Sequence, residues 1–239
     1  MNFIVQRPEW RTTIVALLGL ALTLSASYWQ FGRASDKAAL RQQYSARQAM
    51  LPHDLGNGVP SLEDAAFRKM RATGMFVPEK AILLDNKLRA GAAGYEIVVP
   101  LQLSGSDRHV LINRGWVQRG RDRSDLPVID VPENAVTIVG TAIVPGRGAL
   151  ELSDEIIEGR VWQNLNLSRY RERQQLNILD FVIQEESDHE DGINRNWPAP
   201  GFGIRTHQSY AVQWLLFATL IIFFYCYYGL FRKKTSSTE

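Results

Sequence analysis

Two short clusters near the ends of the chain bring together imidazole, aromatic and cationic side chains. The first holds a tryptophan beside an amide and two cations that share one helical stripe: Trp29, Gln30, Arg33 and Lys37. The second places an imidazole and two aromatic rings on one stripe: His207, Tyr210 and Trp214. Histidine can ligate iron, aromatic rings can cover a planar macrocycle, and cations can meet its carboxylates. Together the clusters suit an amphipathic, anionic macrocycle that carries iron, with His207 as the metal ligand.

The same residue types have a second interpretation, which stays open at this point. Tryptophans such as Trp29 and Trp214 anchor helices at a membrane surface, and cations such as Arg33 and Lys37 bind lipid phosphates. In either case the two clusters act together only where two helices reach the same side of a membrane. The elements that carry the clusters therefore decide what these residues can do.

Two long apolar segments carry the clusters. Neither residues 12–32 nor residues 208–231 include an acidic residue, a lysine or an arginine. Because about 20 helical residues cross a hydrocarbon core, we predict a transmembrane helix over each segment. Ser25-Ala26-Ser27 also fits a signal-peptide cleavage site. The apolar run is long for a signal peptide, which favours a retained anchor.

The charges beside the apolar segments predict their orientation. Basic residues flank both segments on their terminal sides: Arg7, Arg11, Arg232, Lys233 and Lys234. Such residues stay in the cytoplasm, whereas long connecting domains cross the membrane regardless of their charge. We therefore expect residues 1–11 and 232–239 in the cytoplasm, or in the matrix of a mitochondrion. Residues 33–205 are expected outside, in the periplasm for a multi-pass protein of a bacterial inner membrane.

Composition excludes several classes of protein. The chain has 239 residues, 45 % hydrophobic and 22 % charged, with a mean hydropathy of −0.18, which excludes a disordered tail and a polytopic transporter. The 27 basic and 25 acidic residues leave a net charge of +2, too balanced for a nucleic-acid binder. The single cysteine, Cys226, excludes an intramolecular disulfide. Because no nucleophile, acid–base or phosphate-loop motif is present, we expect no enzymatic activity.

Between the apolar segments the pattern changes to short strands. Runs rich in β-branched residues, separated by turn signals, predict about seven strands: 67–76, 80–86, 95–103, 109–117, 134–144, 161–167 and 178–184. Helical signals predict an extension of the first helix over 36–50, a capped turn at 61–64, and a helix over 168–175 with Ser168 as its N-cap. Many strands with one or two short helices predict an antiparallel barrel or sandwich. The chain is thus expected to be an α+β membrane protein, with two transmembrane helices flanking this domain.

Two features of the central domain allow both a structural and a functional interpretation. The segment Asp188-His189-Glu190-Asp191 offers an imidazole and carboxylates that can bind a metal, although a solvated acidic loop is the simpler interpretation. Arg114, in a predicted strand, can pair with an acid inside the domain or dock on a partner. Gly115 beside it is expected at a turn or bulge.

Five stretches of the chain resemble the Surfeit locus protein one family. In chain order they are Trp29-Gln30-Phe31-Gly32-Arg33 with Lys37, Thr73-Gly74-Met75-Phe76, Gly94-Tyr95-Glu96-Ile97-Val98-Val99-Pro100-Leu101, Val110-Leu111-Ile112-Asn113-Arg114-Gly115-Trp116-Val117, and His207 with Tyr210-Ala211 and Trp214. The match covers nearly the whole chain in the right order, and the string over residues 113–117 is highly specific. The family usually has asparagine before the histidine and leucine after it, whereas Thr206 and Gln208 stand here.

Members of this family are membrane-bound assembly factors of cytochrome c oxidase, complex IV of the respiratory chain. The resemblance implies help in maturing the haem-containing subunit I, by receiving haem a transiently and passing it on. It implies subunit I, haem A synthase and membrane lipids as partners, and it makes His207 the counterpart of the family's proposed haem ligand. The alternative is a haem-independent scaffold whose strand domain docks on nascent subunit I.

Overall fold

The computed structural model describes residues 9–120, 126–145, 157–187, 191–198 and 200–230, which form two compact units. One unit joins residues 1–43 to residues 200–239, and the other comprises residues 44–199. The first is helical and the second is built on a sheet. Each unit is described by itself below.

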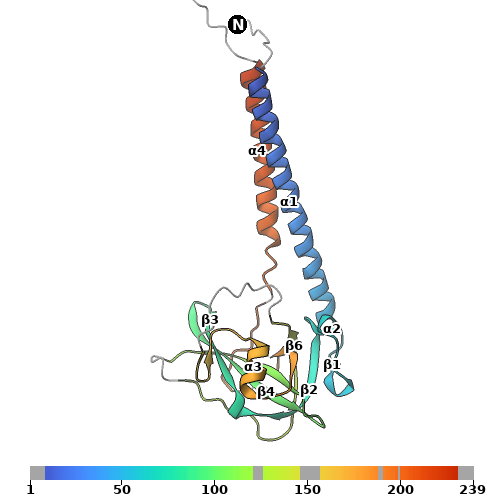
Figure 1. The fold of residues 1–239 in the computed structure, drawn as a ribbon, viewed down its shortest axis with the longest axis vertical. Coiled ribbons are helices and arrows are strands. Elements are labelled where there is room, and N and C mark those ends of the chain that lie inside the picture. Colours follow the sequence, from blue (N-terminus) through green and yellow to red (C-terminus); the bar gives the residue numbers. More distant parts are fainter. Residues whose placement is uncertain (1–8, 121–125, 146–156, 188–190, 199, 231–239) are drawn as a thin grey trace, which may run out of the picture. The chain divides into compact units, whose positions relative to one another are not determined.

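The helical unit is a pair of antiparallel helices, α1 (Trp10–Gln48) and α4 (Ile204–Leu230), drawn side by side in Figure 1. Along α1 the buried and half-buried positions recur every three or four residues and are mostly small: Thr13, Ala16, Gly19, Leu20, Thr23, Ala26, Ser27, Gln30 and Ala34. Small residues let two helix backbones approach closely. Accordingly, the Ser27 hydroxyl donates to the carbonyl of Ala211 on α4 at 3.0 Å.

The outer faces of both helices are apolar and exposed. Leu18 and Leu22 on α1 are about two-thirds exposed, as is Tyr228 on α4. Both helices are long and apolar enough to cross a membrane, and only 11 % of the residues in the most apolar stretch of each are buried. Exposed apolar surface on this scale is typical of protein surfaces that contact lipid or another protein.

The second unit is organised around nine strands with few helices. The strands are β1 (His53–Asp54), β2 (Lys69–Phe76), β3 (Ile82–Arg89), β4 (Ala92–Leu103), β5 (His109–Gln118), β6 (Val136–Ile143), β7 (Ile157–Glu158), β8 (Val161–Trp162) and β9 (Ile178–Glu185). Two α-helices, α2 (Leu62–Ala65) and α3 (Leu167–Gln174), and two 3₁₀ turns, Leu55–Asn57 and Pro78–Lys80, accompany them. Five of the strands close into a barrel in the order β2-β6-β9-β5-β4, because β4 also pairs with β2.

Alternation along the strands separates two apolar cores. On β4, Ile97, Val99 and Leu101 face the interior of the barrel, whereas Val98 between them faces outward. The outer core includes Trp162 and Tyr170, whose rings lie 5.8 Å apart, and Tyr170 belongs to α3. Helix α3 therefore covers an outer face of the barrel while the strands fill its interior (Figure 1).

The predicted antiparallel barrel or sandwich is confirmed as a barrel with short helices, with one difference in pairing. Strands β5 and β9 run parallel, with Leu111 opposite Val182, so the barrel is mixed. The predicted strand over 161–167 is shorter, because only Val161–Trp162 pairs. Helix α3 is capped by Asn166 rather than Ser168, since the Asn166 side chain accepts from the backbone N–H of Arg169 at 3.1 Å.

Candidate functional site

The imidazole of His207 is held by an amide on the neighbouring helix. His207 lies in the first turn of α4, and its Nδ1 is 2.8 Å from Oε1 of Gln30 on α1. An amide oxygen only accepts, so Nδ1 carries the proton and donates it to Gln30. When the ring is in its neutral form its lone pair is then at Nε2, which no residue in the described parts of the chain hydrogen-bonds. This arrangement leaves Nε2 available to a metal and orients the ring through a hydrogen bond at the other nitrogen, as is usual for metal-ligating histidines.

The other predicted site residues lie on the same two helices. The guanidinium carbon of Arg33 is 5.8 Å from the centre of the Trp29 ring, a cation–π contact on α1. Trp214 is half-buried and meets Phe217 edge-on at 5.7 Å. Tyr210 and Lys37 are exposed. Gln30 and His207 are thus brought together directly, while Arg33, Lys37 and Tyr210 present charge and ring surface outward.

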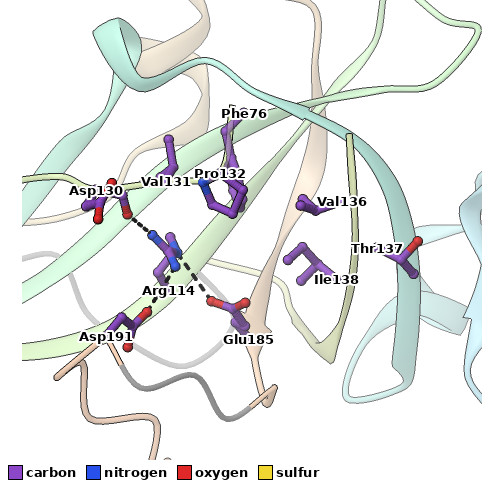
Figure 2. A pocket seen from close by; sticks show the side chains of 10 residues that line it. All are labelled: Phe76, Arg114, Asp130, Val131, Pro132, Val136, Thr137, Ile138, Glu185 and Asp191. Atoms are coloured by element: carbon purple, nitrogen blue, oxygen red, sulfur yellow. Dashed lines mark hydrogen bonds and ion pairs between the residues drawn. The ribbon is translucent and has the colours of Figure 1, made fainter. Parts of the chain in front are cut away.

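The barrel holds a second cluster of ionisable groups, centred on Arg114 of β5 (Figure 2). Its Nε donates to Glu185 at 3.4 Å, one terminal nitrogen donates to Asp191 at 3.0 Å, and the other donates to the carbonyl of Asp130. The guanidinium also lies 5.4 Å from the centre of the Phe76 ring. Arg114 is 5 % exposed and Glu185 is fully buried, so the network is internal. The prediction that Arg114 pairs with an acid inside the domain is confirmed.

A cavity of about 460 Å³ opens beside this network. Its walls combine the charged residues with apolar side chains: Phe76, Arg114, Asp130, Val131, Pro132, Val136, Thr137, Ile138, Glu185 and Asp191. Cavities of this size in the mouth of a barrel are common ligand sites. In the described parts of the chain, no group of three His, Cys, Asp or Glu side chains is placed to hold a metal ion. Of the acidic segment over residues 188–191, residues 188–190 lie outside the described residues, and Asp191 pairs with Arg114 and Arg195.

The comparison with known protein families covers both clusters. The sequence profile of the SURF1 family matches residues 17–219, which include Gln30, Arg114 and His207. The chain belongs to the SURF1 family. The resemblance to the Surfeit locus protein one family is thereby confirmed.

Similar SURF1 proteins come from distant organisms. A SURF1-like protein of Rickettsia felis is 25 % identical over 225 residues, covering 91 % of this chain and 96 % of that protein. An uncharacterized SURF1-like protein of Mycobacterium tuberculosis is 23 % identical over 223 residues, covering 90 % and 81 %. Surfeit locus protein 1 of Arabidopsis thaliana is 27 % identical over 132 residues, covering 48 % and 36 %. The bacterial SURF1 relatives align with this chain over almost its full length.

Sequence reasoning missed Glu185 and Arg195 in this SURF1 domain. Arg195 lies in the segment between β9 and α4, yet its Nε donates to Glu185 at 3.2 Å and its Nη1 donates to Asp191 at 2.8 Å. Asn194 in the same segment pairs with Trp116 through two backbone hydrogen bonds of 2.8 Å. The sequence of this segment gives little sign of burial, because charged residues after a strand resemble a solvated loop. The one signal for its burial was Trp197, whose indole N–H donates to the Glu185 carbonyl at 2.7 Å.

The ion network predicts a loss of stability in acid. The hydrogen bond from Arg195 lowers the pKa of Asp191 to about 2, from an ordinary value of 3.8. A carboxyl whose folded pKa is lowered stabilises the fold above its unfolded pKa and loses that effect as the pH falls through its folded pKa. We expect Asp191→Asn to lower the free energy of unfolding by about 2 kcal/mol at neutral pH. Urea unfolding of both proteins should show this difference shrinking between about pH 4 and pH 2; a constant difference would contradict it.

Proposed function

We propose that α1 and α4 span a bacterial inner membrane, with both termini in the cytoplasm and the barrel in the periplasm. The exposed apolar faces of both helices support this proposal, because such surface is stable in lipid and not in water. The basic residues Arg7 before α1, Arg11 in its first turn and Arg232 after α4 support the orientation. A periplasm-dependent phosphatase fused after Gly120 should be active, and one fused to the C-terminus should be inactive.

We further propose that the protein is a non-enzymatic assembly factor for cytochrome c oxidase. In this proposal it receives haem a, supplied by haem A synthase, and passes it to subunit I as cargo. Membership of the SURF1 family supports the link to the oxidase. The observation that carries the haem step is the hydrogen bond between His207 and Gln30, because it leaves Nε2 as the free ligand atom.

The residues around His207 fit the chemistry of this cargo. Haem carries an iron that an imidazole nitrogen can ligate and propionates that cations can pair with. Gln30 holds the His207 ring in the ligating tautomer. The rings of Trp29, Tyr210 and Trp214 offer apolar cover, and Arg33 and Lys37 offer exposed cations. A single protein ligand at an open site suits a cargo that must be released to the next protein.

Replacing His207 by alanine is expected to abolish the Soret shift that haem produces on binding the detergent-purified protein. Gln30→Leu keeps the ligand but removes its orienting partner, and loss of such a partner weakens metal binding about tenfold. His53→Ala is the matched control, since His53 bonds to the Gly58 carbonyl in the barrel unit and lies outside this site. A Soret shift in His207→Ala equal to that of the wild type would remove His207 as the ligand.

A haem-independent scaffold is the second candidate function, favoured by the cavity beside Arg114. In this candidate the barrel docks on nascent subunit I and the helices serve as anchors. Crosslinking in cells that lack haem a synthesis separates the two candidates. Capture of subunit I without haem a supports the scaffold, whereas capture that requires haem a supports the delivery role.

A further inference from the structure

The cavity beside Arg114 lies along the part of β6 that extends beyond its pairing with β9. Strand β9 pairs with β6 from Gly140 to Ile143, and Glu186 after β9 still donates its N–H to the Val139 carbonyl at 3.0 Å. Beyond that point β6 continues through Ile138 to Val136 and keeps only its pairing with β2 on the opposite side. Thr137 therefore lies on a stretch of strand with one open edge.

The backbone of Thr137 points to that open edge. In an antiparallel pair, backbone groups of alternate residues face the same neighbour. Val139 faces β9, as its bond to Glu186 shows, so Thr137 two residues earlier faces the same side. Thr73 opposite Thr137 confirms this direction, because its carbonyl accepts from Ser104 and so points away from β6. In the described parts of the chain, the N–H and C=O of Thr137 thus have no strand to pair with.

Arg114 offers further donors in the same cavity. A guanidinium has five N–H groups, and three are used toward Glu185, Asp191 and the Asp130 carbonyl. Two N–H groups on a side chain that is 5 % exposed remain without an acceptor among the described residues. Such groups favour an occupant that brings a carbonyl oxygen.

The charge and shape of the cavity select the class of occupant. The carboxylates of Asp130, Glu185 and Asp191 line it together with Arg114, and Arg195 pairs with two of them from outside the lining. Because the three carboxylates outnumber these two cations, an anionic ligand is disfavoured. The remaining wall is apolar and includes Phe76 and Ile138. A volume of about 460 Å³ accommodates an aliphatic or aromatic side chain together with a short stretch of backbone.

We propose that this cavity binds an extended, uncharged segment of a partner polypeptide by strand addition at Thr137. The segment pairs its backbone with the N–H and C=O of Thr137, places an apolar side chain against Phe76 and Ile138, and directs a carbonyl at Arg114. Backbone pairing supplies affinity in this mode, and the side-chain pocket supplies selectivity. The site stands on the barrel alone; only its use in oxidase assembly rests on the proposed function.

A blocked peptide of alternating valine and threonine with a central leucine is the probe, measured by fluorescence anisotropy against the full-length protein in detergent. Thr137→Pro removes the free N–H without breaking the ladder to β2, and we expect binding to weaken roughly tenfold, the effect of about one hydrogen bond. Thr137→Val is the matched control: it removes the hydroxyl that contacts Thr73 but keeps the N–H, and it should bind as the wild type does.

A second peptide keeps the test decisive where Thr137→Pro fails to fold. N-methylation at the central leucine removes the peptide's own N–H donor, so binding to the wild-type protein should fall in the same way. Equal binding of both peptides, equal binding to both Thr137 variants, or no binding of the parent peptide would each overturn the proposal. The haem titration of His207→Ala does not depend on these peptide measurements. A negative peptide result would therefore leave the haem proposal unaffected.

Discussion

Replacing Arg114 by leucine is expected to lower the free energy of unfolding by about 3 kcal/mol. The carboxylate of Glu185 is fully buried and would lose the guanidinium that it pairs with. Removing one partner of a buried ion pair costs about 3–5 kcal/mol, because the remaining charge stays in a medium of low polarity. Arg195 still reaches Glu185 at 3.2 Å, which places the loss at the lower end of that range.

Urea unfolding of the full-length protein, followed by tryptophan fluorescence, measures this loss. Lys69→Met is the matched control, since its pair with Glu186 is about one-third exposed on each side and should contribute at most about 1 kcal/mol. Combining Arg114→Leu with Glu185→Leu removes both charges, and the double variant should be more stable than Arg114→Leu alone. If Arg114→Leu and Lys69→Met lowered the free energy of unfolding equally, burial of the ion pair would not explain the loss.

Gly115→Ala is expected to destabilise the barrel by about 3 kcal/mol, through two separate effects. Gly115 has a φ of 132°, at the point where the β4–β5 register shifts, and side chains rarely adopt this conformation. An added Cβ would also lie 2.5 Å from Cγ2 of Ile193 and 2.8 Å from the carbonyl of Asn194. Overpacking costs about 1–3 kcal/mol in addition to the backbone strain. The predicted bulge at Gly115 is thus confirmed, and the glycine also gives the 191–198 segment room to pack.

A control glycine separates the two effects. Gly58 has a similar φ of 118°, but nothing lies within 4 Å of a Cβ added there. Gly58→Ala should therefore lose only the strain, about 1–2 kcal/mol, in thermal or urea unfolding. Ile193→Ala introduced into Gly115→Ala should recover part of the loss by removing the nearest clashing atom. If Ile193→Ala restored no stability, backbone strain at residue 115 would account for the whole loss.

Much of the fold follows from local patterns in the sequence. The strands over Tyr95–Leu103 and His109–Val117 were predictable from their runs of apolar and β-branched residues. Both are buried along most of their length, because one face lies inside the barrel and the other packs in the outer core. The parallel pairing of β5 with β9 did not follow, since it joins segments that are distant in the chain and no local signal specifies a distant partner. Barrel closure through β2 and β4 has the same non-local origin.

The candidate site was predictable on the helices but not in the barrel. Helical spacing places Gln30 and His207 on definite stripes, and the structure adds the hydrogen bond that joins them. The network of Arg114, Glu185 and Arg195 depends on a backbone segment folding against the barrel end. Charged residues at a strand end have the same composition in a solvated loop as in a buried network, so composition alone could not distinguish them.

The position of β9 in the chain also fixes the order in which the domain can fold during synthesis. A ribosome releases β2, β4, β5 and β6 well before Ile178–Glu185, yet β9 is the strand that joins β5 to β6. Until it emerges, β5 and β6 each present an open edge, the kind of surface on which partly made chains aggregate. Only the short segment ending at Ile204 then separates β9 from α4. During synthesis of the chain, the barrel can therefore close only shortly before the second long helix is complete.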